Sequence, residues 1–125
     1  IDDYEEYVTR VSEDIEIFMK QNCRGEIYEA KNFILKHLSE PELNLDIVAN
    51  HVNLSKNYFS YLFKKDVGDN FITFVTKARV ERADFLYKNT DLKIYQIAGK
   101  VGYSDWRYLT KVYKKYKGTN MTEIR

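Results

Sequence analysis

The chain has 125 residues, of which 44% are hydrophobic and 31% are charged, and its formal net charge is +1. This composition fits one globular domain and excludes a disordered tail. One proline and five glycines are too few for the many turns of an all-β sandwich, and no apolar run approaches the roughly 18 residues of a membrane span. We therefore expect a mostly helical fold.

The first predicted element is an amphipathic helix within residues 1–24. Its apolar residues recur at alternating steps of four and three, as in a heptad stripe: Tyr4, Val8, Val11, Ile15 and Phe18. The segment holds seven acidic and three basic residues, whereas residues 25–125 hold 12 acidic and 17 basic ones. The stripe lasts about two heptads, so two interpretations stay open. It packs against its own domain, or it forms a dimer seam or a link to another domain.

The apolar spacing predicts six further helices, at about residues 26–38, 45–51, 56–66, 71–87, 94–101 and 105–117, and a last turn at 120–125. Pro41 prevents the first of these helices from continuing. The side chains of Ser55 and Asn70 are suited to cap the helices that follow them. Gly68 and Gly118 are placed to end the third and sixth helices.

Two stretches of the sequence repeat each other. Leu45-Asp46-Ile47-Val48-Ala49 matches Ile94-Tyr95-Gln96-Ile97-Ala98, and Val52-Asn53-Leu54-Ser55 matches Val101-Gly102-Tyr103-Ser104. After the serine the second copy has one extra residue, and the match then continues to Gly68 and Gly118. Each copy is a short helix, a tight turn, a second helix capped by serine and a glycine stop, which is the form of a helix-turn-helix.

The residue types suit that motif. The alanine lets the two helices approach closely, and the amides and positive dipole at the start of the capped helix favour phosphate. The second helix of each copy can then enter a DNA major groove. A connecting helix of about 17 residues, roughly 25 Å long, would place two such helices in grooves about 34 Å apart. Residues 104–117 hold five basic residues and one acidic, which indicates either a phosphate-facing helix or a solvated face.

Four sequence motifs occur in an order and at spacings that resemble the DNA-binding domain of AraC/XylS-type transcription regulators. The resemblance is strongest to the C-terminal domain of YesN-type two-component response regulators and covers about residues 26–125. The motifs are Leu54-Ser55-Lys56-Asn57-Tyr58-Phe59-Ser60-Tyr61-Leu62-Phe63-Lys64-Lys65, Ala78-Arg79-Val80-Glu81-Arg82-Ala83, Leu92-Lys93-Ile94-Tyr95-Gln96-Ile97-Ala98, and Val101-Gly102-Tyr103-Ser104-Asp105 through Lys117-Gly118.

The resemblance implies an all-α fold with two helix-turn-helix subdomains joined by a long connecting helix. The expected parts are a linker helix at 1–24, a first unit at 25–68, the connecting helix at 69–88 and a second unit at 89–125. The resemblance also implies sequence-specific binding to promoter DNA and activation of transcription, with RNA polymerase as a further partner. Where this family usually has arginine, the first unit has Tyr61, so a contact from that position stays open.

Base contacts are expected from exposed positions early in the second helix of each unit. In the first unit they are Lys56, Asn57, Ser60 and Tyr61; in the second they are Asp105, Trp106, Arg107, Thr110 and Lys111. Arg107 is the main candidate, because arginine binds guanine O6 and N7 with two hydrogen bonds. Trp106 has two interpretations, contact with DNA or packing against its own domain. Phosphate contacts are expected from Ser55, Lys64, Lys65, Lys93, Ser104, Lys114 and Lys115.

Other residues receive structural interpretations. Four side chains of the second unit are expected to pack inward: Tyr108, Leu109, Val112 and Tyr113. Arg79, with Glu81 or Arg82, is expected to form structural ion pairs in the connecting helix. His37 and His51 lack metal-like partners, and no catalytic pattern or phosphate-binding glycine loop occurs. We therefore expect no enzyme, metal, cofactor or membrane partner.

The single cysteine, Cys23, cannot form an internal disulfide, which favours a cytoplasmic location. The alternative function is a helical protein-interaction or dimerisation module that self-associates through the N-terminal stripe.

Overall fold

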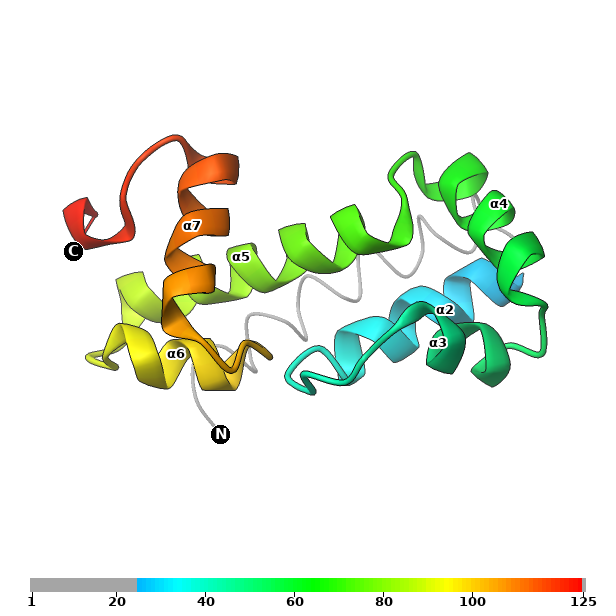
Figure 1. Ribbon diagram of the computed structural model, residues 1–125, viewed down its shortest axis with the longest axis horizontal. Helices are drawn as coiled ribbons and strands as arrows, with labels where there is room; N and C mark the ends of the chain where they lie inside the picture. Colours follow the sequence, from blue (N-terminus) through cyan, green and yellow to red (C-terminus); the bar gives the residue numbers. More distant parts are fainter. Residues whose placement is uncertain (1–24, 125) are drawn as a thin grey trace.

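The computed structural model describes residues 25–124, and these form six α-helices and one short 3-10 helix (Figure 1). The predicted helix within residues 1–24, and Cys23 with it, lie outside the described residues. The described residues contain no strand. The elements are α2 (Gly25–Lys36), α3 (Leu45–His51), α4 (Lys56–Val67), α5 (Phe71–Asn89), α6 (Ile94–Lys100), α7 (Trp106–Lys117) and η1 (Met121–Glu123).

Local capping explains most of these boundaries. Three side-chain oxygens accept a hydrogen bond from the amide three residues further on: Asn44 from Ile47 (2.9 Å), Ser55 from Tyr58 (3.2 Å) and Asn70 from Thr73 (2.8 Å). Gly68 and Gly118 end α4 and α7 in the left-handed conformation, with φ of 95° and 77°. The predicted helices are confirmed, although α2 ends at Lys36, two residues before the predicted end, and α5 continues two residues beyond it.

The buried side chains form two cores that share one helix. The first core lies among α2, α3, α4 and the start of α5, and is filled by residues such as Phe59 and Phe63. The second lies among the rest of α5, α6, α7 and η1, around Leu109 and Tyr113. Because α5 supplies buried residues to both cores, it joins the two units as one rigid element (Figure 1).

The sequence repeat is also a structural repeat. The amide of Leu54 donates to the carbonyl of Ala49 at 3.0 Å, and the amide of Tyr103 donates to that of Ala98 at 2.8 Å. Burial repeats as well: residues 59–72 have the same pattern as 109–122, and 43–55 the same as 92–104 with a single exception, Asn53 against Gly102. The same helical corner is therefore built twice.

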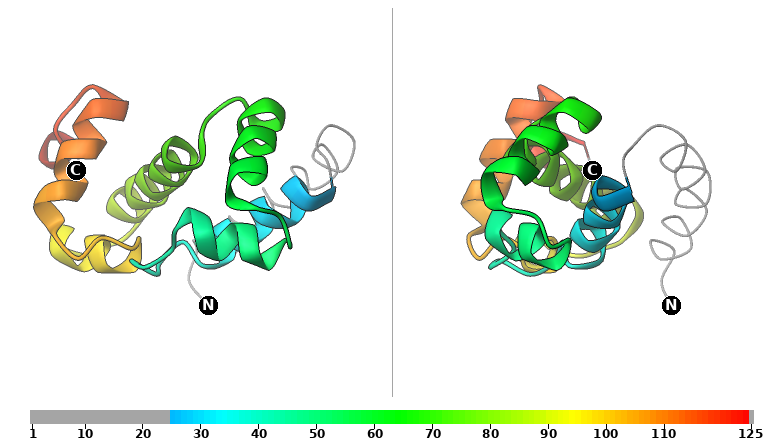
Figure 2. Two further views of the ribbon diagram at one scale, coloured as in Figure 1. Left: turned by 45° about the vertical axis from the view of Figure 1, so that its right-hand side comes forward. Right: turned by 90° about the vertical axis from the view of Figure 1, so that its right-hand side faces the viewer.

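The two units are arranged so that α4 and α7 share a side of the molecule. Seen along the long axis, both helices lie on one side and α2 lies on the other (Figure 2). In the view of Figure 1 the N-termini of α4 and α7 both lie toward the lower edge. Among the described residues, no helix is both long and apolar enough to cross a membrane.

The capping of α7 differs from the prediction. Ser104 was expected to cap it, but the cap is Asp105, whose carboxylate accepts a hydrogen bond from the Arg107 amide at 2.9 Å. The extra residue of the second copy is the reason, because it places one more extended residue between the turn and the helix. In the first unit, Ser55 caps α4 as predicted.

This difference predicts unequal effects for two equivalent serines. Ser55→Ala removes the acceptor for the Tyr58 amide and should lower the free energy of unfolding by about 1 kcal/mol. Ser104→Ala removes no cap, so its effect should stay within about 0.5 kcal/mol. Urea denaturation of both variants beside the wild type measures the difference. Equal losses would contradict the assignment of Asp105 as the cap.

Candidate nucleic-acid interface

The outer face of α4 carries the predicted contact residues of the first unit. Lys56, Asn57 and Tyr61 are exposed, the last with 60% of its surface accessible, while Ser60 is half-buried. The opposite face is fully used by the core, through Phe59, Leu62 and Phe63. The helix is therefore fixed in rotation by its buried face, so that its first two turns present the polar residues to solvent.

The outer face of α7 carries the predicted residues of the second unit. Trp106, Arg107 and Lys111 are exposed, and Thr110 is half-buried with its hydroxyl donating to the Arg107 carbonyl at 2.9 Å. The exposure of Trp106 leaves its indole available to a partner on this face. Inward packing is confirmed for Leu109, Val112 and Tyr113.

Tyr108 corrects the prediction, because it does not pack inward. Half of its surface is exposed, and its ring lies edge-on against Tyr103, with the ring centroids 5.2 Å apart. The inward direction at this turn is taken by Leu109, which is fully buried. Its counterpart in α4, Tyr58, is exposed to a similar extent, 46%. The repeat places both tyrosines beside the predicted contact residues. The sequence analysis missed this position, although the match of Tyr58 with Tyr108 in the repeat was a signal that could have indicated it.

Asp105 and Arg107 form an ion pair at the start of α7. Guanidinium nitrogens Nε and Nη2 of Arg107 each lie 3.1 Å from a carboxylate oxygen of Asp105. The hydrogen bonds from Arg107 lower the pKa of Asp105, and the same hydrogen bonds raise the pKa of Arg107. The Arg107 side chain is 76% exposed. Both shifts favour the charged forms, so the ion pair is present near neutral pH and places the guanidinium at the exposed start of α7.

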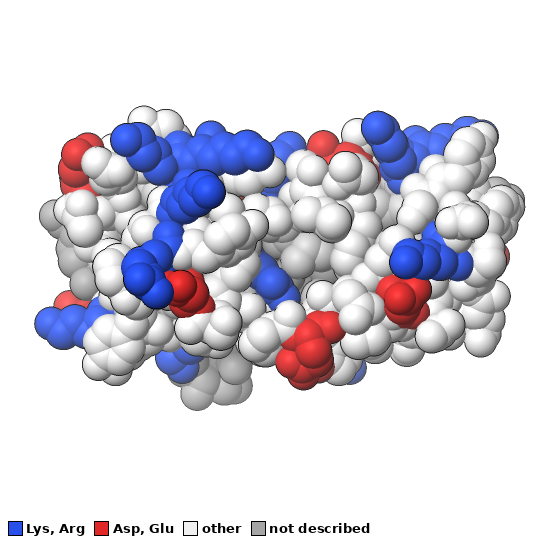
Figure 3. Space-filling model, in the orientation of Figure 1, with Lys and Arg blue, Asp and Glu red and all other residues white. Residues whose placement is uncertain are grey.

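The predicted phosphate-contacting lysines of α4 and α7 are exposed. Lys64 and Lys65 lie in the last turn of α4, and Lys114 and Lys115 lie in the last turn of α7. Figure 3 shows basic side chains along α7 and a second group over α4, with a mostly uncharged surface between them. An arrangement with two basic strips on one face suits the phosphates that flank two separate grooves.

The remaining predicted phosphate contacts occupy the starts of the helices. Ser55 and Ser104 are exposed in the two turns, and Lys93 precedes α6, where its amide donates to the Gln96 side chain at 2.9 Å. The Nζ atom of Lys56 lies 3.8 Å from Oδ1 of Asp46 in the preceding helix. Within residues 25–124, no group of three metal-binding side chains occurs. The rings of His37 and His51 instead lie on Phe33, with centroids 4.3 and 4.2 Å away.

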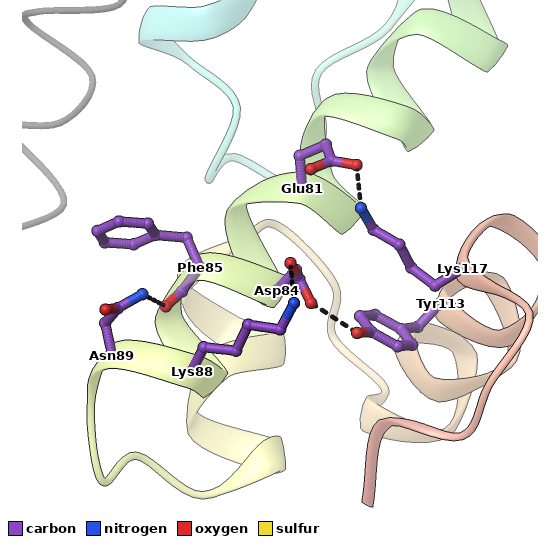
Figure 4. A network of polar contacts seen from close by, with 7 residues as sticks. All are labelled: Glu81, Asp84, Phe85, Lys88, Asn89, Tyr113 and Lys117. Atoms are coloured by element: carbon purple, nitrogen blue, oxygen red, sulfur yellow. Dashed lines mark hydrogen bonds and ion pairs between the residues drawn. The ribbon is translucent and has the colours of Figure 1, made fainter. Parts of the chain in front are cut away.

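A polar network holds α7 against α5 (Figure 4). The Tyr113 hydroxyl donates to Asp84 at 2.6 Å, and Lys88 lies 3.1 Å from the same carboxylate. Lys117 of α7 pairs with Glu81 of α5, as predicted for an ion pair of the connecting helix. The Tyr113 hydroxyl and the Lys117 ammonium group thus help to fix the orientation of α7 where it packs against the connecting helix α5.

Arg79 departs from its predicted role. It is buried, with 7% of its surface accessible, and pairs with no carboxylate of residues 25–124. Its Nε donates to the carbonyl of Leu38 at 3.1 Å and its Nη2 to that of Glu40 at 2.8 Å. These carbonyls lie in the turns that follow α2, and the carbonyl of Glu40 also accepts a hydrogen bond from the Leu43 amide at 3.2 Å. No periodicity in the sequence indicates this contact, because its partners lie about 40 residues away.

Comparisons with known proteins agree with this geometry. The model of a helix-turn-helix domain family matches residues 48–125. The chain is similar to the arabinose operon regulatory protein of Escherichia coli, with 28% identity over 97% of this chain and 41% of that protein. It is also similar to the regulatory protein PocR of Salmonella typhimurium, with 40% identity over 70% of this chain and 28% of that protein. The chain thus spans less than half the length of these relatives.

Solved structures share the fold. The C-terminal domain of AraT, a response regulator from Geobacillus stearothermophilus, is 35% identical, with a TM-score of 0.78 over 80% of this chain and 83% of that one. The C-terminal domain of the response regulator YesN from Fusobacterium nucleatum is 31% identical, with a TM-score of 0.73 over 75% and 91%. The DNA-binding domain of AdpA is 20% identical, with a TM-score of 0.75 over 80% and 89%, which shows a shared fold.

The network around Asp84 predicts a pH-dependent contribution to stability. Burial raises the pKa of Asp84, but the hydrogen bond from Tyr113 and the pair with Lys88 outweigh it and hold the pKa below its usual value. A carboxylate with a lowered pKa stabilises the fold above its unfolded pKa, and this contribution is lost as pH falls through the folded value. Asp84→Asn should therefore cost about 1 kcal/mol at pH 7, and progressively less below about pH 4.

Urea denaturation at pH 7 and pH 3 tests this expectation. Asp91→Asn serves as the control, because Asp91 is an exposed aspartate in the loop after α5 and should change stability little at either pH. A loss that is equal at both pH values would show that the Asp84 carboxylate does not act through its charge.

Proposed function

Because this chain belongs to the AraC-type family of helix-turn-helix DNA-binding regulator domains, we propose that it binds promoter DNA with α4 and α7 in successive major grooves. One observation carries the proposal. The capped first turns of both helices lie on the same side of α5 and expose polar and basic residues there. A duplex laid against that side meets both helices at once. The AdpA domain, which shares the fold, was solved in complex with a target DNA, and this supports the same mode here.

We assign sequence recognition chiefly to the second unit. Arg107 presents a two-pronged donor at the start of α7, which matches guanine O6 and N7. Lys111 lies one turn further along the same exposed face. The Asp105 carboxylate holds the guanidinium in place before DNA arrives, and can accept from a cytosine amino group once Arg107 turns to a base.

The first unit contributes contacts of a different kind. Asn57 can pair with adenine through two hydrogen bonds, while Tyr61 and Tyr58 offer exposed rings to sugar or thymine methyl groups. Tyr108 supplies a similar ring in the second unit. Lys64, Lys65, Lys114 and Lys115 are proposed to meet the phosphates, together with Ser55, Lys93 and Ser104. These contacts position the helices without reading sequence.

The proposal predicts distinct effects for two substitutions in α7. Arg107→Ala should lower affinity for the preferred site about tenfold or more and relax the preference at one or two base pairs. Lys111→Ala should weaken binding or specificity at the neighbouring base or phosphate. Fluorescence anisotropy on a site obtained by random-oligonucleotide selection measures affinity, and a salt titration on the same site reports how many phosphates are neutralised.

Lys36→Ala is the matched control, because Lys36 is an exposed lysine at the end of α2, outside the two helices proposed to enter the grooves. It should leave specific affinity and the slope of the salt dependence unchanged. If Arg107→Ala and Lys111→Ala also leave specific binding unchanged, the role given to α7 is wrong.

Further proposals concern the longer protein and its partners. We propose that this domain acts in the cytoplasm as the DNA-binding output of a transcription activator, and that RNA polymerase is its partner at the promoter. Two of the similar solved structures are C-terminal domains of response regulators, which supports a place in such a protein. We also propose that the heptad stripe of residues 1–24 mediates self-association. Deleting residues 1–22 should then lower the number of chains per particle, obtained from the light-scattering mass divided by the mass of one chain, while DNA binding is retained. An unchanged number of chains per particle would exclude the stripe as an interface.

A further inference from the structure

Arg79 is the one charged side chain that is buried among the described residues. It projects from the middle of α5 and donates to the carbonyls of Leu38 and Glu40, which follow α2 in the first unit. Burial lowers its pKa, so the fold holds the charge at a cost that the two carbonyls offset. A buried cation at a helix midpoint needs a reason beyond filling space, because an apolar residue would avoid that cost.

The same guanidinium also contacts the second unit. It lies over the ring of Tyr103, with Cζ 5.3 Å from the ring centroid. Tyr103 belongs to the turn between α6 and α7, directly before the first turn of α7. One side chain of the connecting helix therefore touches the loop that follows α2 and the turn that leads into α7. In Figure 1 this loop and this turn approach each other in the middle of the molecule.

Gly102 shows how closely the two units meet. A Cβ at this position would lie 2.5 Å from the Leu38 carbonyl oxygen and 2.9 Å from two atoms of the Arg79 guanidinium. The equivalent position in the first unit is Asn53, which is exposed and also has positive φ, 59° against 98°. This pair is the exception in the burial pattern of the repeated turns. The two copies of the turn therefore differ in burial at the position where the second unit contacts the first.

We propose that Arg79 is a positioning residue that fixes the spacing and rotation of α7 relative to α4, and that it thereby sets the half-site spacing that the domain accepts in DNA. This inference rests on the proposed binding by both helices. Helix α5 joins the two units, and each unit packs on a different part of it. The contacts of Arg79 and Gly102 add a direct attachment between the units away from the α5 axis, and this attachment restrains how the units tilt and turn relative to each other.

The test measures affinity against spacing. A panel of duplexes carries the selected site with zero to five base pairs inserted between its halves, and a second panel carries each half alone. The wild type should bind one spacing best and lose about tenfold or more per step away from it, because the second helix then engages at a reduced effective concentration. Arg79→Met keeps the length of the side chain but cannot bridge the units, so its profile should flatten to about twofold between neighbouring spacings.

A second variant guards against loss of folding in the first. Gly102→Ala keeps the arginine at position 79 but inserts a methyl group against its guanidinium and the Leu38 carbonyl, so it should broaden or shift the spacing profile. Asn53→Ala is its matched control, because it strains the equivalent turn at an exposed position and should keep the wild-type profile. Circular dichroism and urea denaturation identify which variants are folded.

The outcomes separate the two proposals. If the folded variants keep the sharp wild-type profile, the positioning role is wrong and binding by both helices stands. Equal weakening on all duplexes, including the single halves, would show a purely structural role and also overturn the inference. A wild type that binds single halves as tightly as the joined site would overturn the two-groove binding itself, and the inference with it.

Discussion

The architecture depends on one helix being shared between two cores. Each unit has only about 40 residues, and chains of that length seldom bury enough surface to fold alone without a metal or a disulfide. Helix α5 resolves this constraint, because Val75 faces the first core and Val80 the second. Since each core is completed by a different part of the same rigid rod, folding both units also sets the approximate separation of α4 and α7. Stability and DNA geometry are thus supplied by the same buried contacts.

The repeated corner shows which features are needed for its construction and which were free to change. Both copies keep a left-handed residue in the turn, an alanine whose carbonyl receives the returning amide, and a left-handed glycine at the end. One difference is in the turn, where Asn53 is exposed and Gly102 is buried, and another is at the exposed start of the second helix, where Ser55 caps α4 but Asp105 caps α7. One inserted residue therefore brings an acid beside Arg107, and the two helices present different chemistry. We expect the two halves of the DNA site to differ accordingly.

The sequence predicted what depends on neighbours along the chain. Helix positions and the caps at Ser55 and Asn70 follow from residues within one turn, and the repeat identified both corners before any coordinates. The failures share a cause: Tyr108 is exposed because Leu109 fills the core, and Arg79 is buried because two distant carbonyls receive it. Both facts depend on which element packs where, and that is tertiary information. The family resemblance supplied function, while the contact residues remain predictions.

The ion pair of Asp105 and Arg107 affects recognition of a base as well as the capping of α7. In the free domain the carboxylate occupies the two donors that a guanine would use, so binding must first release them. Because 76% of the Arg107 side chain and 47% of the Asp105 side chain are exposed, water and salt replace the interaction at little cost. If Arg107 binds guanine as proposed, the two guanine acceptors replace the carboxylate in matching geometry, whereas at another base the guanidinium stays paired with Asp105. The acid therefore lowers the net gain from a guanine contact by the small free energy of the pair, and keeps the guanidinium hydrogen-bonded where no guanine is present.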